Sequence, residues 1–119
     1  MDASFGSYES GVYDGCSNQS SVIDHGVQAV GYGFDPSNGA YWIVRNSWGE
    51  EWGDAGYIKI ARTAGRPAPC RLDPHNSEGD GCKDSPETIT VCGECGILSD
   101  SSYPTGAYIP TAPTAADLH

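Results

Sequence analysis

Apolar residues gather into three short segments in the first half of the chain, and their composition predicts β-strands. Residues 22–33 carry valine and isoleucine and end in small residues, residues 41–45 are aromatic and β-branched, and residues 56–61 alternate between apolar and polar. β-Branched and aromatic side chains favour the pleated backbone of a sheet. We therefore expect three strands in this half of the chain.

Turn-forming residues separate the first two of these predicted strands. Asp35-Pro36 and Asn38-Gly39 both lie within residues 34–40, which predicts a hairpin loop. Residues 46–55 contain two tryptophans and two glycines. They indicate an irregular, packed connection to the third strand.

The apolar pattern ends after the third strand. Residues 62–94 are rich in Gly, Pro, Asp and Ser and contain three cysteines, so we expect a long loop that disulfides hold or that is disordered. A last apolar patch follows in residues 97–109. The Pro/Thr/Ala-rich residues 110–119 indicate a flexible C-terminal tail.

The composition favours one small domain that is mostly β. Of 119 residues, 38% are hydrophobic, and the 16 Gly and 8 Pro make up about a fifth of the chain, compared with about 12% in average proteins. No apolar run approaches the ~20 residues of a membrane span. The first six residues have neither the basic nor the apolar region of a signal peptide, so we expect none within this chain.

The net charge of −10, with only six Lys and Arg, argues against two classes of partner. Nucleic-acid binding needs basic side chains to neutralise phosphates. Anionic membrane surfaces would repel so acidic a chain.

Five cysteines are many for a chain of this length and favour an oxidising compartment with disulfide bonds. Because the number is odd, one thiol stays free or pairs with another chain. Asn18-Gln19-Ser20 is a glycosylation sequon, so Asn18 is a candidate acceptor.

The predicted hairpin brings His25 close to Asn46. Opposite residues of an antiparallel hairpin are equally distant from its turn. The midpoint of His25 and Asn46 falls between Asp35 and Pro36, inside the predicted loop. We therefore expect the imidazole and the amide to be neighbours, within the uncertainty of a register predicted from sequence.

A histidine beside an asparagine amide has a known use in nucleophilic catalysis. The amide oxygen accepts from one ring N–H and fixes the tautomer, which leaves the other ring nitrogen to face a nucleophile. With cysteine as that nucleophile, the imidazolium stabilises the thiolate and later protonates the leaving group. A histidine with only a structural role is the alternative.

At this point the sequence resembles the right-hand domain of papain-like cysteine proteases of the cathepsin L type. The match covers residues 2–62 and 92–105. The spacing of an Asn-Ser-Trp-Gly block after Asp-His-Gly is its most specific feature. The matching blocks are Asp24-His25-Gly26-Val27, Val30-Gly31-Tyr32-Gly33, Tyr41 to Gly49, Trp52-Gly53, Gly56-Tyr57, Cys95-Gly96-Ile97 and Ser102-Tyr103-Pro104.

This resemblance implies roles for the matching residues. His25 corresponds to the general base and acid, and Asn46 to the residue that orients it. Trp48 corresponds to a side chain that shields the pair from water, although plain core packing would also explain a tryptophan there. Asp24 and Gly26 would contact the substrate.

Two further positions correspond to the S2 specificity pocket of the family. Ile23 would form part of its wall, and Asp100 would lie at its floor. A carboxylate there pairs with Arg or Lys at P2, so we expect a pocket that accepts both hydrophobic and basic P2 residues. The alternative is an Asp100 side chain turned to solvent.

The chain also departs from the family pattern. It has no Cys-Gly-Ser-Cys-Trp block for the nucleophile and no glutamine for the oxyanion hole. By resemblance Cys16 pairs with Cys95, and one more bridge is expected among Cys70, Cys82 and Cys92, which leaves one thiol for another chain. Cys92 and Cys95, with Cys70 and Cys82, also allow a zinc or redox interpretation. A lone C-x-x-C is weak evidence for either, so we expect no metal and no cofactor.

Together these features predict a fold of the α+β family in which this chain is the mostly β, antiparallel, barrel-like right-hand domain. We expect that domain in residues 1–109, with a cysteine-rich loop insert at 66–91 and a flexible tail at 110–119. The expected function is the His/Asn-bearing half of a cysteine endopeptidase, which acts on peptides or proteins once a left-hand domain supplies the cysteine. The expected location is the lysosome, the vacuole or the cell exterior. The alternatives are an inactive half-domain that serves as a structural or binding subunit and a metal or redox module.

Overall fold

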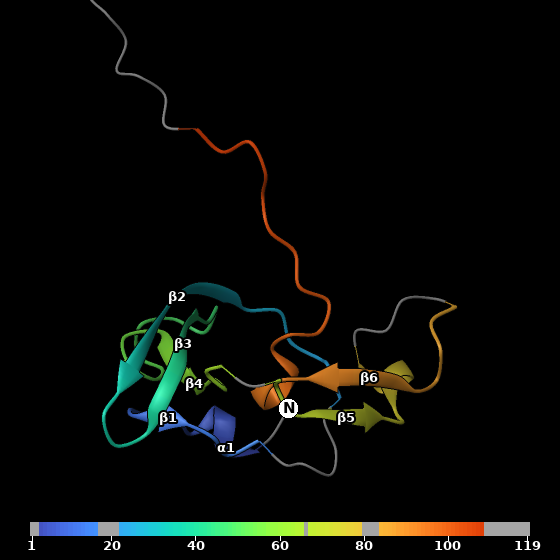
Figure 1. Cartoon of the computed structure of the whole chain (residues 1–119), viewed down its shortest axis with the longest axis horizontal. Coiled ribbons are helices and arrows are strands. Elements are labelled where there is room, and N and C mark those ends of the chain that lie inside the picture. The colour runs from blue at the N-terminus through green and yellow to red at the C-terminus, as the bar shows by residue number, and fades with distance from the viewer. Residues whose placement is uncertain (1–2, 17–21, 66, 80–83, 109–119) are drawn as a thin grey trace, which may run out of the picture.

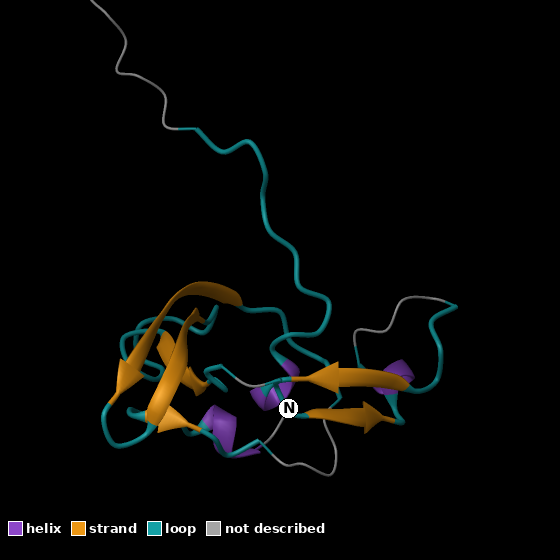
Figure 2. Ribbon diagram, viewed as in Figure 1, coloured by secondary structure: helices purple, strands orange, loops and turns teal. Residues whose placement is uncertain are grey.

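Short strands account for most of the regular structure in this computed structural model, which describes residues 3–16, 22–65, 67–79 and 84–108 (Figures 1 and 2). The two 3₁₀ helices are labelled η1 and η2. The elements are α1 (Ala3–Gly6), β1 (Val12–Tyr13), β2 (Gln28–Asp35), β3 (Gly39–Arg45), β4 (Tyr57–Ala61), β5 (Cys70–Asp73), η1 (Asn76–Glu78), β6 (Ile89–Cys92) and η2 (Glu94–Gly96).

The larger sheet has the strand order β1-β4-β3-β2, and the smaller sheet pairs β5 with β6. Figure 1 shows the two sheets side by side. The mostly β character is confirmed. The larger sheet is open among the described residues and its β1–β4 pair is parallel, so the expected barrel-like, antiparallel description fits only loosely.

The hairpin of β2 and β3 is the predicted one, with a shorter turn: β2 extends two residues further than predicted, to Asp35, and β3 begins two residues earlier, at Gly39. Asp35 pairs with Gly39, and the Asp35 Oδ1 atom accepts hydrogen bonds from the backbone N–H groups of Ser37 and Asn38 at 2.9 and 2.8 Å. These bonds hold the pKa of Asp35 below its usual value. Gly39 has a φ of 85°, a left-handed conformation that glycine adopts without strain. The turn is therefore tight enough for pairing to begin earlier than expected.

The predicted strand at residues 22–33 is wrong in its first part. Pairing begins only at Gln28, and residues 22–27 lie outside every strand. Within β2 the register shifts between Ala29 and Gly31, so Val30 forms a bulge. The third strand is confirmed at Tyr57–Ala61.

The core lies on one face of the larger sheet. Val44, Ile58 and Ile60 point to this face from neighbouring positions in β3 and β4, and all three are almost completely buried. Phe5 and Tyr8, from the segment around α1, cover them. Deletion of a side chain such as Ile58 from this core would cost about 2–5 kcal/mol.

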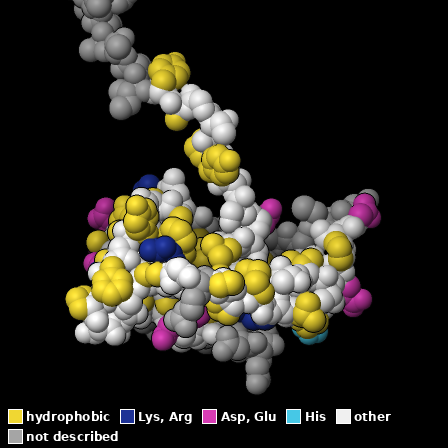
Figure 3. All heavy atoms as spheres, viewed as in Figure 1, with side chains coloured by type: hydrophobic (Ala, Val, Ile, Leu, Met, Phe, Trp, Pro, Cys, Tyr) yellow, Lys and Arg dark blue, Asp and Glu magenta, His cyan; other side chains and the backbone are white. Residues whose placement is uncertain are grey.

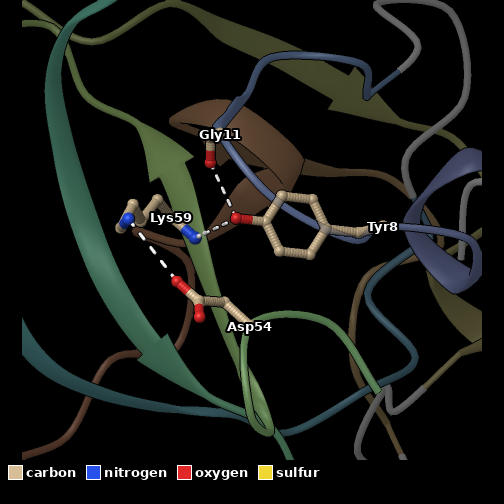
Figure 4. A network of polar contacts seen from close by, with 4 residues as sticks. All are labelled: Tyr8, Gly11, Asp54 and Lys59. Carbon is tan, nitrogen blue, oxygen red and sulfur yellow. Dashed lines mark hydrogen bonds and ion pairs between the residues drawn. The ribbon is translucent and has the colours of Figure 1, made fainter. Parts of the chain in front are cut away.

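Tyr8 joins the N-terminal segment to the sheet (Figure 4). Its hydroxyl donates to the carbonyl oxygen of Gly11 at 2.7 Å and accepts from the backbone N–H of Lys59 at 3.4 Å. The Lys59 ammonium in turn lies 3.5 Å from a carboxylate oxygen of Asp54. The chain before β1 is therefore fixed against β4.

The cysteine-rich segment is more ordered than predicted, because β5 and β6 form an antiparallel hairpin within it. Cys70 lies opposite Cys92, and a disulfide joins them. Asp73 is fully buried at the end of β5, where its Oδ1 atom accepts from the N–H of His75 at 2.9 Å. The side-chain amide of Asn76 donates to the carbonyl of Pro86 at 2.9 Å. We call the described residues 67–79 and 84–92 the insert hairpin.

The chain leaves the body after η2 (Figure 1). Ile97 packs against the core, whereas Tyr103 and Tyr108 are almost fully exposed. The expected tail at 110–119 lies outside the described residues. Within the described ranges, no helix has the length and apolar character needed to cross a membrane.

Candidate active site

Asn46 lies at the end of β3 and contacts His25, as the hairpin geometry predicts. The backbone N–H of Asn46 donates to the carbonyl of Gly56 at 3.0 Å, which fixes the residue beside the 46–56 connection. Its side chain is buried, and its Oδ1 atom lies 2.8 Å from Nε2 of His25. The contact joins two residues 21 positions apart in the sequence.

The surroundings of Asn46 determine the tautomer of His25. Oδ1 also accepts the N–H of Ser47 at 2.8 Å, which identifies this atom as the amide oxygen. An amide oxygen only accepts, so Nε2 of His25 carries the hydrogen and donates it. In a neutral ring Nδ1 then has a lone pair. Among the described residues Nδ1 has no hydrogen-bond partner, so this edge of the ring can take or give a proton.

One polar atom of the site is left without a partner in the described part of the chain. Nδ2 of Asn46 is buried and makes no hydrogen bond there. An unsatisfied buried donor costs about 1–3 kcal/mol. The amide is kept in this orientation because its oxygen accepts two hydrogen bonds, from Ser47 and His25.

Trp48 covers one face of the histidine. The rings of His25 and Trp48 stack with centroids 5.2 Å apart and planes 28° apart. Trp52 meets Trp48 edge-on at 5.1 Å, and Phe5 stacks on Trp52 at 5.5 Å. The indole N–H of Trp52 donates to the carbonyl of Gly6 at 3.0 Å. Trp48 therefore packs against the aromatic rings of Trp52 and Phe5, although 41% of its surface remains exposed.

No role for Phe5 or Trp52 in supporting the site was predicted from the sequence. The four-residue spacing of Trp48 and Trp52 is the only signal that could have indicated the pair. Phe5 is too far away in the sequence for any local pattern to connect it to them.

Three of the other sequence-predicted residues are neighbours of His25 in the chain, whereas Asp100 is far from it in the sequence. Asp24 and Gly26 flank His25 and are exposed, and Ile23 is half-buried. Asp100 is exposed and has a left-handed backbone with a φ of 51°. The predicted glycosylation residue Asn18 lies outside the described residues.

Four of the five cysteines form disulfides in the structure. One joins Cys16 to Cys95, the pairing that the resemblance implied, and the other joins Cys70 to Cys92. Oxidised cysteines offer neither a thiolate nucleophile nor a thiolate ligand. Glu94, close to both sulfurs of the first bridge, accepts the N–H of Cys16 at 2.8 Å. These bonds favour the structural interpretation of the cysteines, and Cys82 lies outside the described residues.

Comparison with known proteins points to one family. The model of the papain family cysteine proteases matches residues 1–79, about two thirds of the chain. A "Cathepsin L-like" protein of Caenorhabditis elegans is 58% identical over 59 residues, which is 50% of this chain and 18% of that protein. The "Probable cysteine protease RD21B" of Arabidopsis thaliana is 43% identical over 99 residues, 82% of this chain and 15% of that protein.

A solved structure also matches in part. The bromelain protease from Ananas comosus, in complex with the E64 inhibitor, is 47% identical and superposes with a TM-score of 0.48 over 54% of this chain and 29% of that one. The chain thus spans less than a fifth of the length of these two curated relatives and less than a third of the solved one.

Proposed function

Because this chain belongs to the papain family of cysteine proteases, we propose that it is the His/Asn-bearing half of a cysteine endopeptidase, active only when a left-hand domain supplies the nucleophilic cysteine. The observation that carries this proposal is the 2.8 Å hydrogen bond from Nε2 of His25 to Oδ1 of Asn46, beneath the stacked ring of Trp48. It gives the imidazole one fixed edge and one reactive edge.

In the proposed reaction, Nδ1 of His25 takes the proton of the partner's thiol and forms a thiolate–imidazolium pair. The thiolate attacks the peptide carbonyl, and the imidazolium protonates the leaving amine as the acyl-enzyme forms. His25 then takes a proton from the water that hydrolyses the acyl-enzyme. Asn46 remains neutral throughout and keeps the ring in one orientation.

The open edge of the larger sheet supports docking of a partner. Among the described residues β2 is one of the two edge strands of this sheet, and Val30, Tyr32 and Phe34 on it are 50–72% exposed. We call these three residues the β2 apolar patch. Hydrophobic side chains are prominent over the part of the molecule that holds this sheet (Figure 3). Contiguous exposed apolar side chains are typical of interaction surfaces, and an unpaired strand edge offers hydrogen bonds to a further strand.

Asp24 and Gly26, beside His25, would contact the substrate. The half-buried Ile23 supports its proposed place in the S2 wall. The exposed carboxylate of Asp100 suits a basic P2 side chain, because it stays solvated until such a residue arrives. Hydrophobic P2 residues would pack on Ile23.

Two disulfides among the described residues support an oxidising location, which we propose to be the lysosome, the vacuole or the cell exterior. In such a compartment Asn18 would be glycosylated. The remaining cysteine, Cys82, would be the thiol for a bridge to another chain.

The test combines the full 119-residue chain with the separately produced left-hand domain of a papain-like protease. Hydrolysis of a fluorogenic peptide, and labelling of the partner's cysteine by an epoxide thiol inhibitor, should both depend on the chain. His25→Ala should abolish both, whereas His75→Ala should change neither, because His75 is exposed in the insert hairpin and, among the described residues, its side chain contacts only Glu78. If the two domains bind each other without hydrolysis or labelling, the chain is instead a structural or binding subunit.

A further inference from the structure

The segment that leads into His25 has no strand partner. Among the described residues, the ladder of the larger sheet begins only at Gln28, so residues 22–27 lack its hydrogen bonds. Asn46 and Trp48 hold the imidazole ring itself. The main chain before the ring needs other support, because an unpaired segment loses about 1–2 kcal/mol of conformational entropy per residue when it is fixed.

Gly79, in the insert hairpin, lies directly against this segment. A Cβ atom at Gly79 would lie 2.9 Å from the carbonyl carbon of Ile23 and 2.7 Å from Cγ1 of Val22, closer than real Cβ atoms approach their neighbours. The φ of Gly79 is −112°, outside the left-handed region. Glycine is therefore required here by space and not by backbone conformation. The insert hairpin touches the main chain two residues before His25.

Gly96, in η2, supports the same segment at its side chain. A Cβ atom at Gly96 would meet Cδ1 of Ile23 at 2.5 Å, so Ile23 packs directly on the bare backbone of η2. The Cys16–Cys95 disulfide fixes η2 to the chain that comes from β1. Ile23 is thus held at its main chain by Gly79 and at its side chain by Gly96.

The insert hairpin and η2 are joined to each other. The N–H of Gly93 donates to the carbonyl of Pro69 at 2.9 Å, and the N–H of Leu98 donates to the carbonyl of Cys92 at 3.1 Å. The disulfide between Cys70 and Cys92 closes the hairpin at the same point. A displacement of the insert hairpin would therefore move both residues that Ile23 packs against, Gly79 and Gly96.

We propose that the insert hairpin positions His25 for catalysis by fixing the main chain of Val22 and Ile23, with Gly79 as the positioning residue. Its effect on the rate rests on the proposed function, whereas the positioning is a property of this chain alone. Gly79→Ala must displace the Ile23 carbonyl, which is backbone and cannot rotate away. His25 then moves relative to Asn46. Misplacement of a catalytic group by about 1 Å can cost about 100-fold in rate.

The first measurement uses nitrogen-15 NMR of the imidazole in the full chain. In the unchanged chain His25 should populate the tautomer with hydrogen on Nε2, because that atom donates to Asn46. Gly79→Ala should mix the two tautomers while the methyl signals of Val44 and Ile58 keep their positions. Ser77→Ala is the control, because Ser77 lies in the same insert hairpin, two residues from Gly79, and its side chain is exposed.

A second variant covers the case in which Gly79→Ala does not fold. The double change Cys70→Ser and Cys92→Ser opens the hairpin without adding an atom near Ile23, and it should also mix the tautomers. An unchanged His25 tautomer in every variant that folds would overturn the inference. Global unfolding of both variants would also overturn it, since the insert hairpin would then support the core and not His25 in particular.

The peptidase assay with the added left-hand domain separates this inference from the proposed function. With Gly79→Ala we expect kcat to fall about 10- to 100-fold, and with Ser77→Ala we expect it to stay unchanged. If the tautomer changes but no combination hydrolyses peptide, the proposed function fails and the positioning stands. If the unchanged chain is active and Gly79→Ala matches it in both kcat and tautomer, the positioning fails and the proposed function stands.

Discussion

Asn46 holds His25 through one hydrogen bond of 2.8 Å, and the same amide oxygen also accepts the N–H of Ser47. This arrangement links the orientation of the imidazole to the end of strand β3. The backbone N–H of Asn46 donates in turn to the carbonyl of Gly56, the residue before β4. The orientation of the ring is therefore tied to the sheet.

Removal of the Asn46 amide should therefore lower activity more than stability. In Asn46→Ala the imidazole ring of His25 loses its hydrogen-bond acceptor. If this hydrogen bond stabilises the transition state by about 1.4–2.8 kcal/mol, kcat should fall about 10- to 100-fold. The buried, unpartnered Nδ2 atom is removed too, which offsets part of the stability cost. The measurement is peptide hydrolysis with the left-hand domain, alongside thermal unfolding.

Asn38→Ala provides the control for that experiment. Asn38 is an exposed asparagine in the turn between β2 and β3, where it contacts Asp35. Its loss should leave kcat unchanged. Equal losses of kcat in the two variants would show that Asn46 acts only through the general stability of the hairpin.

The stack of Trp48 on His25 predicts that kcat decreases stepwise from the unchanged chain to Trp48→Phe and then to Trp48→Ala. Trp48→Phe keeps an aromatic face over the imidazole and should retain most of the peptidase rate, whereas Trp48→Ala opens the hydrogen bond to water and should reduce it severalfold. Aromatic pairs of this kind contribute about 0.5–1.5 kcal/mol. The order of kcat across the three proteins is the measurement, and an alanine variant as active as the original would rule out the shielding role.

The carboxylate of Asp100 predicts a preference that charge alone should control. Asp100→Asn keeps the size of the side chain and should abolish any advantage of Arg over Leu at P2, without changing hydrolysis of Leu substrates. The comparison is kcat/KM for two peptides that differ only at P2. Asp84→Asn is a close control, because Asp84 is also an exposed aspartate with a positive φ, 73° against 51°.

The hydrogen bonds to Asp35 predict a dependence of stability on pH. They lower the pKa of Asp35 in the folded state, led by the backbone N–H of Asn38, then that of Ser37. A group with a depressed folded pKa stabilises the fold above its unfolded pKa, near 4, and this stabilisation is lost as the pH falls through the folded pKa. Asp35→Ala should therefore lower Tm at neutral pH, and the difference from the unchanged chain should shrink in acid.

Thermal unfolding between pH 7 and pH 2 measures this effect. Asp14, an exposed aspartate outside the turn, gives a comparison variant, Asp14→Ala. A Tm difference for Asp35→Ala that stays constant down to pH 2 would show that the turn loses its side-chain contacts and not a charge-dependent bond.

The His25–Asn46 contact could be predicted because the hairpin has strong local signals. Turn residues and β-branched residues around Asp35 determine which residues of the two strands face each other. An error of one or two residues in the position of the turn still leaves the side chains of His25 and Asn46 close enough to meet. The bulge at Val30 changed the register by one residue. No local pattern predicts such a bulge, because it depends on packing across the sheet.

Two parts of the fold could not be predicted in this way. Residues 22–27 begin with Val22 and Ile23, which favour a strand, but Ile23 packs on Gly96 and Gly79 instead of joining the sheet. The strands β5 and β6 have four residues each, too few for periodicity to show. The disulfide between Cys70 and Cys92 holds the two strands together. Which cysteines pair depends on their distance in the folded chain, which the sequence does not give.

The Cys16–Cys95 bridge has a consequence for the lifetime of the molecule in the presence of proteases. It spans 79 positions and encloses His25, Asn46 and the insert hairpin in one covalent ring. A single backbone cut in the exposed stretch after Arg62 would open the ring but release no fragment. A nicked molecule would therefore keep the His25–Asn46 pair, and separation of its two pieces would require a second cut or reduction of the bridge.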